Sequence, residues 1–373
     1  MEIRGQIGFS EEQGDLLEVA VNFCRDKSPV DKVRSLLTDD LGYDPQVWTE
    51  IAELGWLGIA IPEEFGGVGL GLAEVVPVVE QMGRNLMAGP FVSTTLAAQA
   101  VLVGGTDEQK ADLLPAFASG TPAALALAED HADWDLTHVT CTAKRDGDQV
   151  VLSGTKTFVT DADTANWILA SVSLDGAPQL VVIDRSQVPD GAFRKEVVID
   201  ETRRSYQVTL DGITLSASAV LEPAKSAETL VHLHLAANLL LSAEMCGGTA
   251  SAIDYTVDYL QTRKQFGKTI GSYQSLKHPI VDAHVDFEKA RSHLYSAAYT
   301  FSQQGEGEIA TRMAKSTACK AFAFAADRAI QFHGGFGFTY DCDAQLYRRR
   351  AIWCEAMQGD GAYHRKKLAD LLL

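Results

Sequence analysis

Basic residues are scarce in this sequence: 32 Lys and Arg stand against 50 Asp and Glu, which gives a formal net charge of −18. Because nucleic acids and anionic lipids attract basic surfaces, this balance disfavours nucleic acid and membrane surfaces as partners. No uninterrupted apolar run reaches the roughly 18 residues of a membrane-spanning helix. The N-terminal sequence MEIRGQIGFSEEQ also lacks the basic-then-apolar layout of a secretory signal, so we expect a cytoplasmic protein.

Cysteine is scarce as well, with six residues in 373. That number is too small for a disulfide scaffold, and no two cysteines form a Cys-x-x-Cys pair. The sequence has no His-Glu-x-x-His spacing and no Gly-x-Ser-x-Gly segment. Zinc proteases and serine hydrolases are therefore disfavoured. We expect isolated, buried thiols and no metal site.

The pattern of apolar residues changes twice along the chain and predicts three domains. Up to residue 122 the period is helical, from 123 to 225 short alternating runs are separated by turns such as Asp146-Gly147, and from 226 to 373 long helical segments return. The prediction is an α+β fold with an N-terminal α-helical domain (1–122), a middle β domain (123–225) and a C-terminal four-helix bundle (226–373). The helices expected are Trp48–Leu57, Leu72–Met82, Leu230–Thr262, Gln274–Gln303 and Glu308–Phe332.

Two motifs in the last domain suggest a surface for a phosphate-bearing ligand. Arg263 ends a long helical run and is followed closely by Phe266-Gly267. A guanidinium at a helix end can bind a phosphate through two hydrogen bonds, although an Arg there can also simply cap the helix. Gln331 precedes the glycine-rich segment HGGFG, which lets the backbone approach a ligand closely. A helix rather than a strand precedes these glycines, so this is no dinucleotide-binding fingerprint.

Four segments, in order, make the sequence resemble the acyl-CoA dehydrogenase family over essentially the whole chain. They are GWLGIAIPEEFGGVGLG (55–71), LALAEDHADWD with DGDQVVLSGTKTFVTDADTANW (125–167), YLQTRKQFGKTIGSYQSLKH (259–278) and IQFHGGFGF (330–338). The resemblance implies that family's fold, with a β-barrel or sandwich in the middle. It further implies FAD as the cofactor, an acyl-CoA substrate and an electron-transferring flavoprotein as the electron acceptor.

The resemblance also implies roles for single residues. Phe158 and Thr160 match positions beside the isoalloxazine ring. The adenosine–pyrophosphate half of FAD is matched by Arg263, Phe266, Gln274, Gln331, Gly334 and Gly335. In the family this half belongs to the flavin bound mainly by the neighbouring subunit, so the resemblance implies an oligomer.

The sequence departs from the family at the reacting centre. The usual base is a Glu directly before a Gly, but here Gln358 precedes Gly359, and a neutral amide cannot accept the proton. In other members the base lies on the first helix of the bundle, where this chain has Ala237. Ala128 replaces the Thr that bonds to the flavin ring, and Asp133-Trp134 replaces a small Gly-Ser pair.

Several functions remain open. The chain could be a self-sufficient dehydrogenase with a relocated base, either Glu355, which would share a helix face with Gln358 if that stretch is helical, or Glu244. It could be the base-lacking subunit of a heteromeric dehydrogenase that resembles those for bulky, steroid-like acyl-CoA esters, paired with a related subunit; this is the hypothesis we favour. A third hypothesis is a flavin-free scaffold or binding protein that has kept the fold, and a fourth is a related oxidase.

Overall fold

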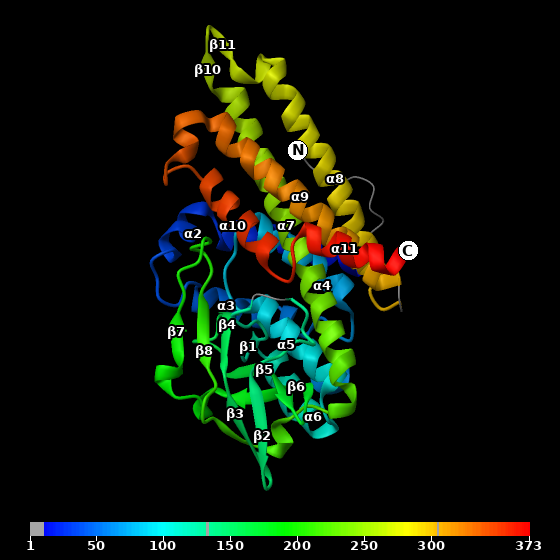
Figure 1. Cartoon of the computed structure of the whole chain (residues 1–373). Helices are drawn as coiled ribbons and strands as arrows, with labels where there is room; N and C mark the ends of the chain where they lie inside the picture. The colour runs from blue at the N-terminus through cyan, green and yellow to red at the C-terminus, as the bar shows by residue number, and fades with distance from the viewer. Residues whose placement is uncertain (1–10, 132–133, 304–305) are drawn as a thin grey trace. The chain divides into compact units, whose positions relative to one another are not determined.

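The computed structural model describes residues 11–131, 134–303 and 306–373. Figure 1 shows helices first, strands in the middle and helices again at the end, which confirms the predicted α+β class. The helices before the strands are α1 (Glu11–Lys27), α2 (Val30–Leu36), α3 (Pro45–Glu53), α4 (Leu72–Arg84), α5 (Phe91–Gly104) and α6 (Asp107–Ala118).

Local signals account for the limits of these helices. α3 begins where the Asp44 side chain accepts a hydrogen bond from the Gln46 amide. The predicted helix from Trp48 to Leu57 is wrong at its end, because Gly55 adopts a left-handed φ of +72° and α3 stops at Glu53. The predicted helix over Leu72–Met82 is confirmed inside α4.

The middle of the chain forms two packed sheets. The strands are β1 (Ala123–Ala126), β2 (Thr142–Asp146), β3 (Gln149–Ser153), β4 (Thr155–Thr160), β5 (Trp167–Leu174), β6 (Ala177–Asp184), β7 (Phe193–Lys195), β8 (Ser205–Thr209) and β9 (Thr214–Ser216). One sheet has the order β1-β5-β2-β3-β9 with β6 on β5, and the other has the order β4-β8-β7. Leu152 and Ile168 of the first sheet share a buried core with Val159 and Val208 of the second. This packing is the predicted sandwich.

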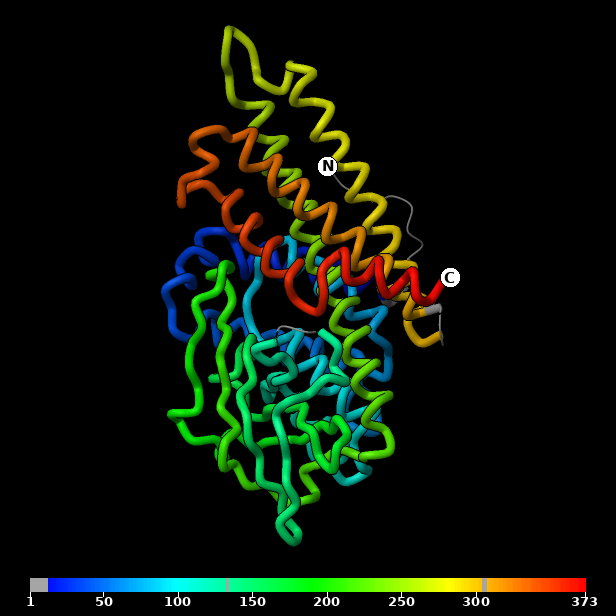
Figure 2. The backbone as a smooth tube through the Cα atoms, viewed as in Figure 1, coloured from blue at the N-terminus to red at the C-terminus, as the bar shows by residue number. Residues whose placement is uncertain are grey.

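Long helices fill the last third of the chain, as predicted. They are α7 (Ser226–Thr262), α8 (Gln274–Thr300), α9 (Glu306–His333), α10 (Ala344–Ala356) and α11 (Gly361–Leu372). A hairpin of β10 (Lys264–Gln265) and β11 (Lys268–Thr269) and a 3-10 turn, η7 (Ile270–Ser272), join α7 to α8, and a second turn, η8 (Gly334–Phe338), follows α9. In the tube of Figure 2, α8 (yellow) and α9 (orange) run alongside each other, as their contacts require.

The chain folds into two compact units, each built from separated segments. The helical unit contains the chain up to Ser35, Leu72–Met87 and Asn238–Leu373, and the β unit contains Leu36–Gly71 and Ala88–Ala237. The predicted limits at 122 and 225 mark where the chain changes from helices to strands and back to helices. The division into three domains at these limits stays a prediction.

The helical unit buries charge where α4 meets α8. The Glu80 carboxylate of α4 accepts hydrogen bonds from Arg291 Nε at 2.7 Å and from the Tyr295 hydroxyl at 2.5 Å, both on α8. Glu80 is 4% exposed, so the ion pair is largely shielded from water. A buried carboxylate needs such partners, and α4 is thereby tied to a helix that follows much later in the chain.

Helix α7 is unusually apolar. By length and composition the stretch Pro223–Thr262 could cross a membrane, and it is the single such stretch found among the described residues. However, 83% of its most apolar window is buried inside the protein. A helix that is buried on all sides inside a protein is apolar for that reason, so the composition of α7 does not require a membrane.

Candidate active site

The residues predicted to form the adenosine cradle lie on two stretches of the helical unit. Arg263 directly follows α7, Phe266 lies in the β10–β11 hairpin, and Gln274 begins α8. On the other stretch, Gln331 is in the last turn of α9, and η8 begins with Gly334 and Gly335.

A small apolar cluster brings these two stretches together. Leu260 of α7, Ile270 of η7 and Phe332 of α9 are buried against one another. Leu260 lies three residues before Arg263, and Phe332 directly follows Gln331. The cluster therefore holds the whole predicted cradle at one end of the helical unit.

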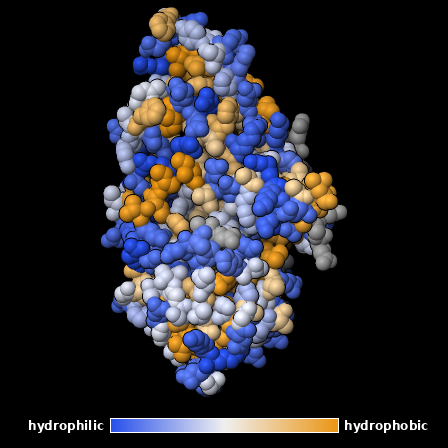
Figure 3. Space-filling model, viewed as in Figure 1, coloured by the Kyte–Doolittle hydropathy of each residue, from blue (hydrophilic) through white to orange (hydrophobic). Residues whose placement is uncertain are grey.

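The cradle is open to solvent. Phe266 is 92% exposed, and Arg263, Gln274 and Gln331 are exposed as well. Gly334 has a left-handed φ of +62°, and no atom lies within 4 Å of the point where a Cβ would be. Figure 3 shows apolar side chains beside hydrophilic ones at the end where Figure 1 draws β10 and β11. An accessible guanidinium, two amides and bare backbone fit a phosphate-bearing cofactor.

The two residues predicted to lie beside the flavin ring belong to the β unit. Thr160 ends β4, and Phe158 lies in a bulge where the pairing with β8 shifts register between Lys156 and Val159. Phe158 has a left-handed φ of +52° and is 40% exposed. Its amide donates a hydrogen bond of 3.0 Å to the Glu196 carboxylate. The bulge therefore presents Phe158 at the surface, with its backbone amide held by Glu196.

Ala128 lies beside this bulge. The Thr157 amide donates a 3.0 Å hydrogen bond to the Ala128 carbonyl in an isolated bridge between the two segments. The structure thus brings Ala128 next to Thr157, the residue before Phe158, and the Ala side chain offers no hydroxyl. Trp134 is half-buried, and Asp133 lies outside the described residues.

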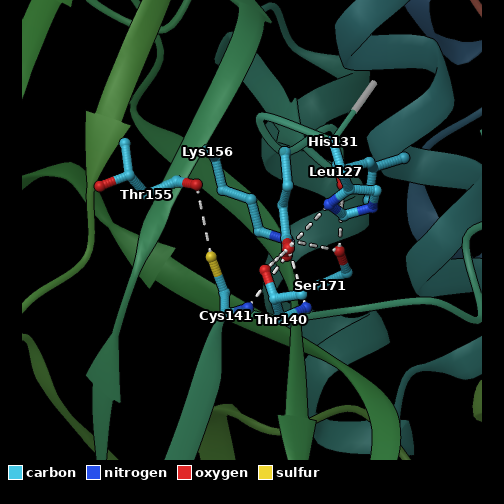
Figure 4. A network of polar contacts seen from close by, with 8 residues as sticks. Leu127, His131, Thr140, Cys141, Thr155, Lys156 and Ser171 are labelled. Atoms are coloured by element: carbon cyan, nitrogen blue, oxygen red, sulfur yellow. Dashed lines mark hydrogen bonds and ion pairs between the residues drawn. The ribbon is translucent and has the colours of Figure 1, made fainter. Parts of the chain in front are cut away.

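A buried ion pair stabilises the segment that carries Ala128 (Figure 4). Lys156 Nζ donates to Glu129 Oε1 at 2.6 Å and to Ser171 Oγ at 2.9 Å. The same carboxylate accepts the amide hydrogens of Thr140 at 2.8 Å and Cys141 at 3.1 Å. Lys156 is fully buried and Glu129 is 4% exposed. Both charged groups of the pair are therefore hydrogen-bonded without water.

The environment of Glu129 keeps it ionised. Burial alone would raise the pKa of its carboxyl group, but the hydrogen bonds from Lys156 and Thr140 outweigh burial and lower the pKa to about 2. Burial lowers the pKa of the Lys156 ammonium, and the neighbouring carboxylate opposes that effect. Lys156 and Glu129 form an ionic pair, because a fixed carboxylate and a hydroxyl both accept hydrogen bonds from Nζ.

The predicted base position lies in a rigid loop between α10 and α11. Gln358 has a left-handed φ of +61°, and its buried Oε1 has no hydrogen-bond partner among the residues that the structure describes. Buried Lys315 donates to the carbonyls of Cys354 at 2.7 Å and Met357 at 2.9 Å. His364 Nε2 donates to the Gln358 carbonyl at 3.1 Å. These hydrogen bonds fix the backbone at the base position, but the side chain there is an amide, which is no base.

Neither alternative base is well placed. α10 ends at Ala356, so Glu355 and Gln358 do not share a helix face, and the condition for Glu355 is not met. Glu244 is 4% exposed and is hydrogen-bonded to the guanidinium of Arg350, which is fully buried. Its carboxylate is therefore engaged in neutralising a buried cation inside the helical unit.

The sequence analysis did not identify Glu129, Lys156, Glu196 or Lys315. The first two had a visible signal, because each is a charged residue within a run of apolar or strand-forming residues (LALAE and TKTFV). All six cysteines are buried thiols, as predicted. In the parts of the chain that are described, no group of three or more His, Cys, Asp or Glu could hold a metal ion.

Comparison with known proteins agrees with this arrangement. Residues 10–121 match the family described as acyl-CoA dehydrogenase, N-terminal domain, and residues 236–373 match acyl-CoA dehydrogenase, C-terminal domain. The chain is 31% identical over 312 residues to acyl-CoA dehydrogenase FadE12 of Mycobacterium tuberculosis, covering 79% of each. It is 30% identical over 344 residues to acyl-CoA dehydrogenase IpdE2 of Mycolicibacterium smegmatis, covering 92% of this chain and 93% of that one.

Solved structures show the same fold. A variant of the protein described as Tcur3481-Tcur3483 steroid ACAD superposes with a TM-score of 0.87 at 29% identity, covering 97% of this chain and 98% of the other. A glutaryl-coenzyme A dehydrogenase superposes with a TM-score of 0.89 at 23% identity, covering 98% and 96%. Fold and site together define a flavin-dependent oxidoreductase that acts on CH–CH bonds. This chain belongs to the acyl-CoA dehydrogenase family.

The family's cofactor is FAD, and the residues of this chain fit its adenosine–pyrophosphate half. Arg263 and Gln331 supply exposed donors, and Gly334 leaves open the space that a side chain would fill. The part that meets the flavin ring fits less completely, because Ala128 lacks the hydroxyl and Gln358 lacks the carboxylate.

Proposed function

We propose that this chain is the base-lacking subunit of a heteromeric acyl-CoA dehydrogenase. The observation that carries the proposal is Gln358, a neutral amide at the base position of a loop that Lys315 and His364 keep rigid. α,β-Dehydrogenation of an acyl-CoA needs a carboxylate that removes the proton next to the thioester. Bound FAD supplies the acceptor for the hydride.

The chain's contribution is the cradle at the end of the helical unit. Arg263, Gln331 and the backbone at Gly334 would hold the adenosine–pyrophosphate half of an FAD whose ring lies in a related subunit. That subunit would supply the carboxylate base. Such a division of labour explains why the cradle is retained while Gln358 and Ala128 occupy reacting positions.

The relatives suggest the kind of substrate and assembly. The relative at 29% identity, Tcur3481-Tcur3483, carries two protein names and is a steroid ACAD. We infer from this likeness a bulky, steroid-like acyl-CoA as the substrate, and we keep an electron-transferring flavoprotein as the proposed electron acceptor.

The test is to purify the full chain alone and together with a related subunit that has the Glu base, and to measure flavin content. Alone it should carry little FAD and show little dehydrogenation. The complex should contain about one FAD per pair, and Arg263→Ala should weaken FAD binding about ten- to a hundredfold, because a charge-assisted contact contributes about 1.5–3 kcal/mol. A yellow homo-oligomer with one FAD per chain, reduced by an acyl-CoA, would overturn the proposal. Absence of flavin in every assembly would favour a scaffold.

Glu355→Gln tests the relocated base in the same complex. Because a general base contributes about 10²–10⁴-fold, loss of the true base would be plain in the turnover number. We expect unchanged turnover. A loss of that size at unchanged FAD content would restore the self-sufficient enzyme.

A further inference from the structure

His333, the last residue of α9, lies between two tyrosines of α7. Its ring centroid is 4.7 Å from that of Tyr255 at an interplanar angle of 12°, and 4.1 Å from that of Tyr259 at 26°. His333 is 4% exposed. Three stacked rings therefore join the C-terminal end of α7 to the C-terminal end of α9.

The imidazole also has a polar contact that a phenyl ring could not make. Its Nδ1 lies 2.7 Å from the Ala329 carbonyl oxygen. Because a carbonyl only accepts, Nδ1 carries the proton and donates to the carbonyl one turn earlier in α9. Burial lowers the pKa of His333, in keeping with a neutral ring. The side chain thus bonds to the last turns of its own helix and packs against α7 at the same time.

The location of this stack connects it to the cradle. Tyr259 lies four residues before Arg263, and His333 lies between Gln331 and Gly334. The apolar cluster of Leu260 and Phe332 is adjacent in the sequence to both. The stack is thus built into the two stretches whose relative position sets the distance between the guanidinium and the glycine-rich backbone.

We propose that His333 is a positioning residue of the FAD cradle, which holds Gln331 and Gly334 in register with Arg263. The inference rests on the proposed function of the cradle. A ligand with two phosphates must meet donors from both stretches at once, and preorganised donors bind it without the entropic cost of ordering them. His333 itself need not touch the cofactor.

The test uses the full chain in the assembly in which it purifies, with ADP as a probe for the adenosine–pyrophosphate half and FMN as a probe for the other half. Calorimetric titration should show ADP binding about tenfold weaker in His333→Ala. His333→Phe keeps the stack and should stay within about threefold of the wild type for ADP, because the lost helix-end hydrogen bond is the smaller contribution. FMN binding should be the same in all three proteins.

Phe322→Leu is the control for general destabilisation. Phe322 is fully buried on the same helix, α9, where it packs against α7 at Gly248. This variant should lower the melting temperature yet bind ADP like the wild type. The inference falls if His333→Ala binds ADP as well as the wild type does, or if Phe322→Leu loses as much affinity. A self-sufficient yellow homo-oligomer would overturn the proposed function but leave the result for His333 standing.

Discussion

The carboxylate of Glu244 on α7 is hydrogen-bonded to the guanidinium of Arg350 on α10, inside the helical unit. The side chains are 5% and 0% exposed, so water does not screen the two charges. Glu244 was one of two candidates for a relocated base. Its pairing assigns it instead to the neutralisation of a buried cation.

Replacing Glu244 with Gln should therefore destabilise the protein. The change leaves the Arg350 charge buried and uncompensated, which costs about 3–5 kcal/mol. Denaturant titration should show a lower midpoint for Glu244→Gln, and the double variant Glu244→Leu/Arg350→Met should recover most of the loss. If Glu244 were the base, Glu244→Gln would abolish turnover at unchanged stability.

Gly247→Ala should disrupt the crossing of α4 and α7. A Cβ at Gly247 would lie 1.8 Å from the Glu80 carbonyl oxygen. Forcing extra atoms into a packed core costs about 1–3 kcal/mol or more, which exceeds the gain of about 1 kcal/mol in helix propensity. The matched control is Gly14→Ala in α1, where nothing lies within 4 Å, and that variant should become more stable. Thermal unfolding of both variants tests this prediction. Equal unfolding midpoints for Gly247→Ala and Gly14→Ala would contradict the close contact between α4 and α7 at Gly247.

Lys156→Met should lower stability and shift acid unfolding to higher pH. The pKa of Glu129 is lowered from 4.5 to about 2 in the fold, so its contribution is full above about pH 4.5 and is lost as the pH falls toward 2. Without Lys156 the carboxylate protonates at a higher pH, and breaking a buried pair costs about 3–5 kcal/mol. Lys144→Met, at an exposed site on β2, should change stability by no more than about 0.5 kcal/mol. Equal effects of the two changes would show that the buried pair contributes nothing.

His364→Gln should flatten the dependence of stability on pH. Burial, with Lys315 and Arg312 nearby, lowers the pKa of His364 from 6.5 to about 3. Its contribution is therefore full above about pH 6.5 and is lost as the pH falls toward 3, by at most about 1.4 kcal/mol per unit. A Gln can still donate to the Gln358 carbonyl but does not titrate. Unfolding free energies at about pH 7 and pH 5 should differ less in the variant than in the wild type. Identical differences would mean that the pKa of His364 is the same in the folded and the unfolded chain.

Periodicity was enough to predict most of the secondary structure. Helices over Leu230–Thr262 and Gln274–Gln303 are close to the observed limits, because each depends on local spacing of apolar residues. The end of α3 was missed because a single left-handed glycine, Gly55, outweighs the apolar pattern on either side.

The ion pairs of the site could not be predicted in the same way. Glu129 and Lys156 are 27 residues apart, and Glu244 and Arg350 are 106 apart. Charged residues are normally exposed, and nothing in local spacing reveals which of them meet inside a fold. The resemblance indicated Gln358 as the base position. Only the structure shows that Lys315 and His364 keep that loop rigid although the base is absent.

The two-unit architecture has a consequence for synthesis on the ribosome. α4 belongs to the helical unit, and its Glu80 pairs with Arg291. Arg291 is synthesised 211 residues after Glu80. At about 5–20 residues per second, the part of α4 that packs against α8 stays uncovered for about 10–40 s. The β unit ends at Ala237, so it can fold during that interval. Nascent α4 is therefore a segment that a ribosome-associated chaperone would have to protect until α8 is made.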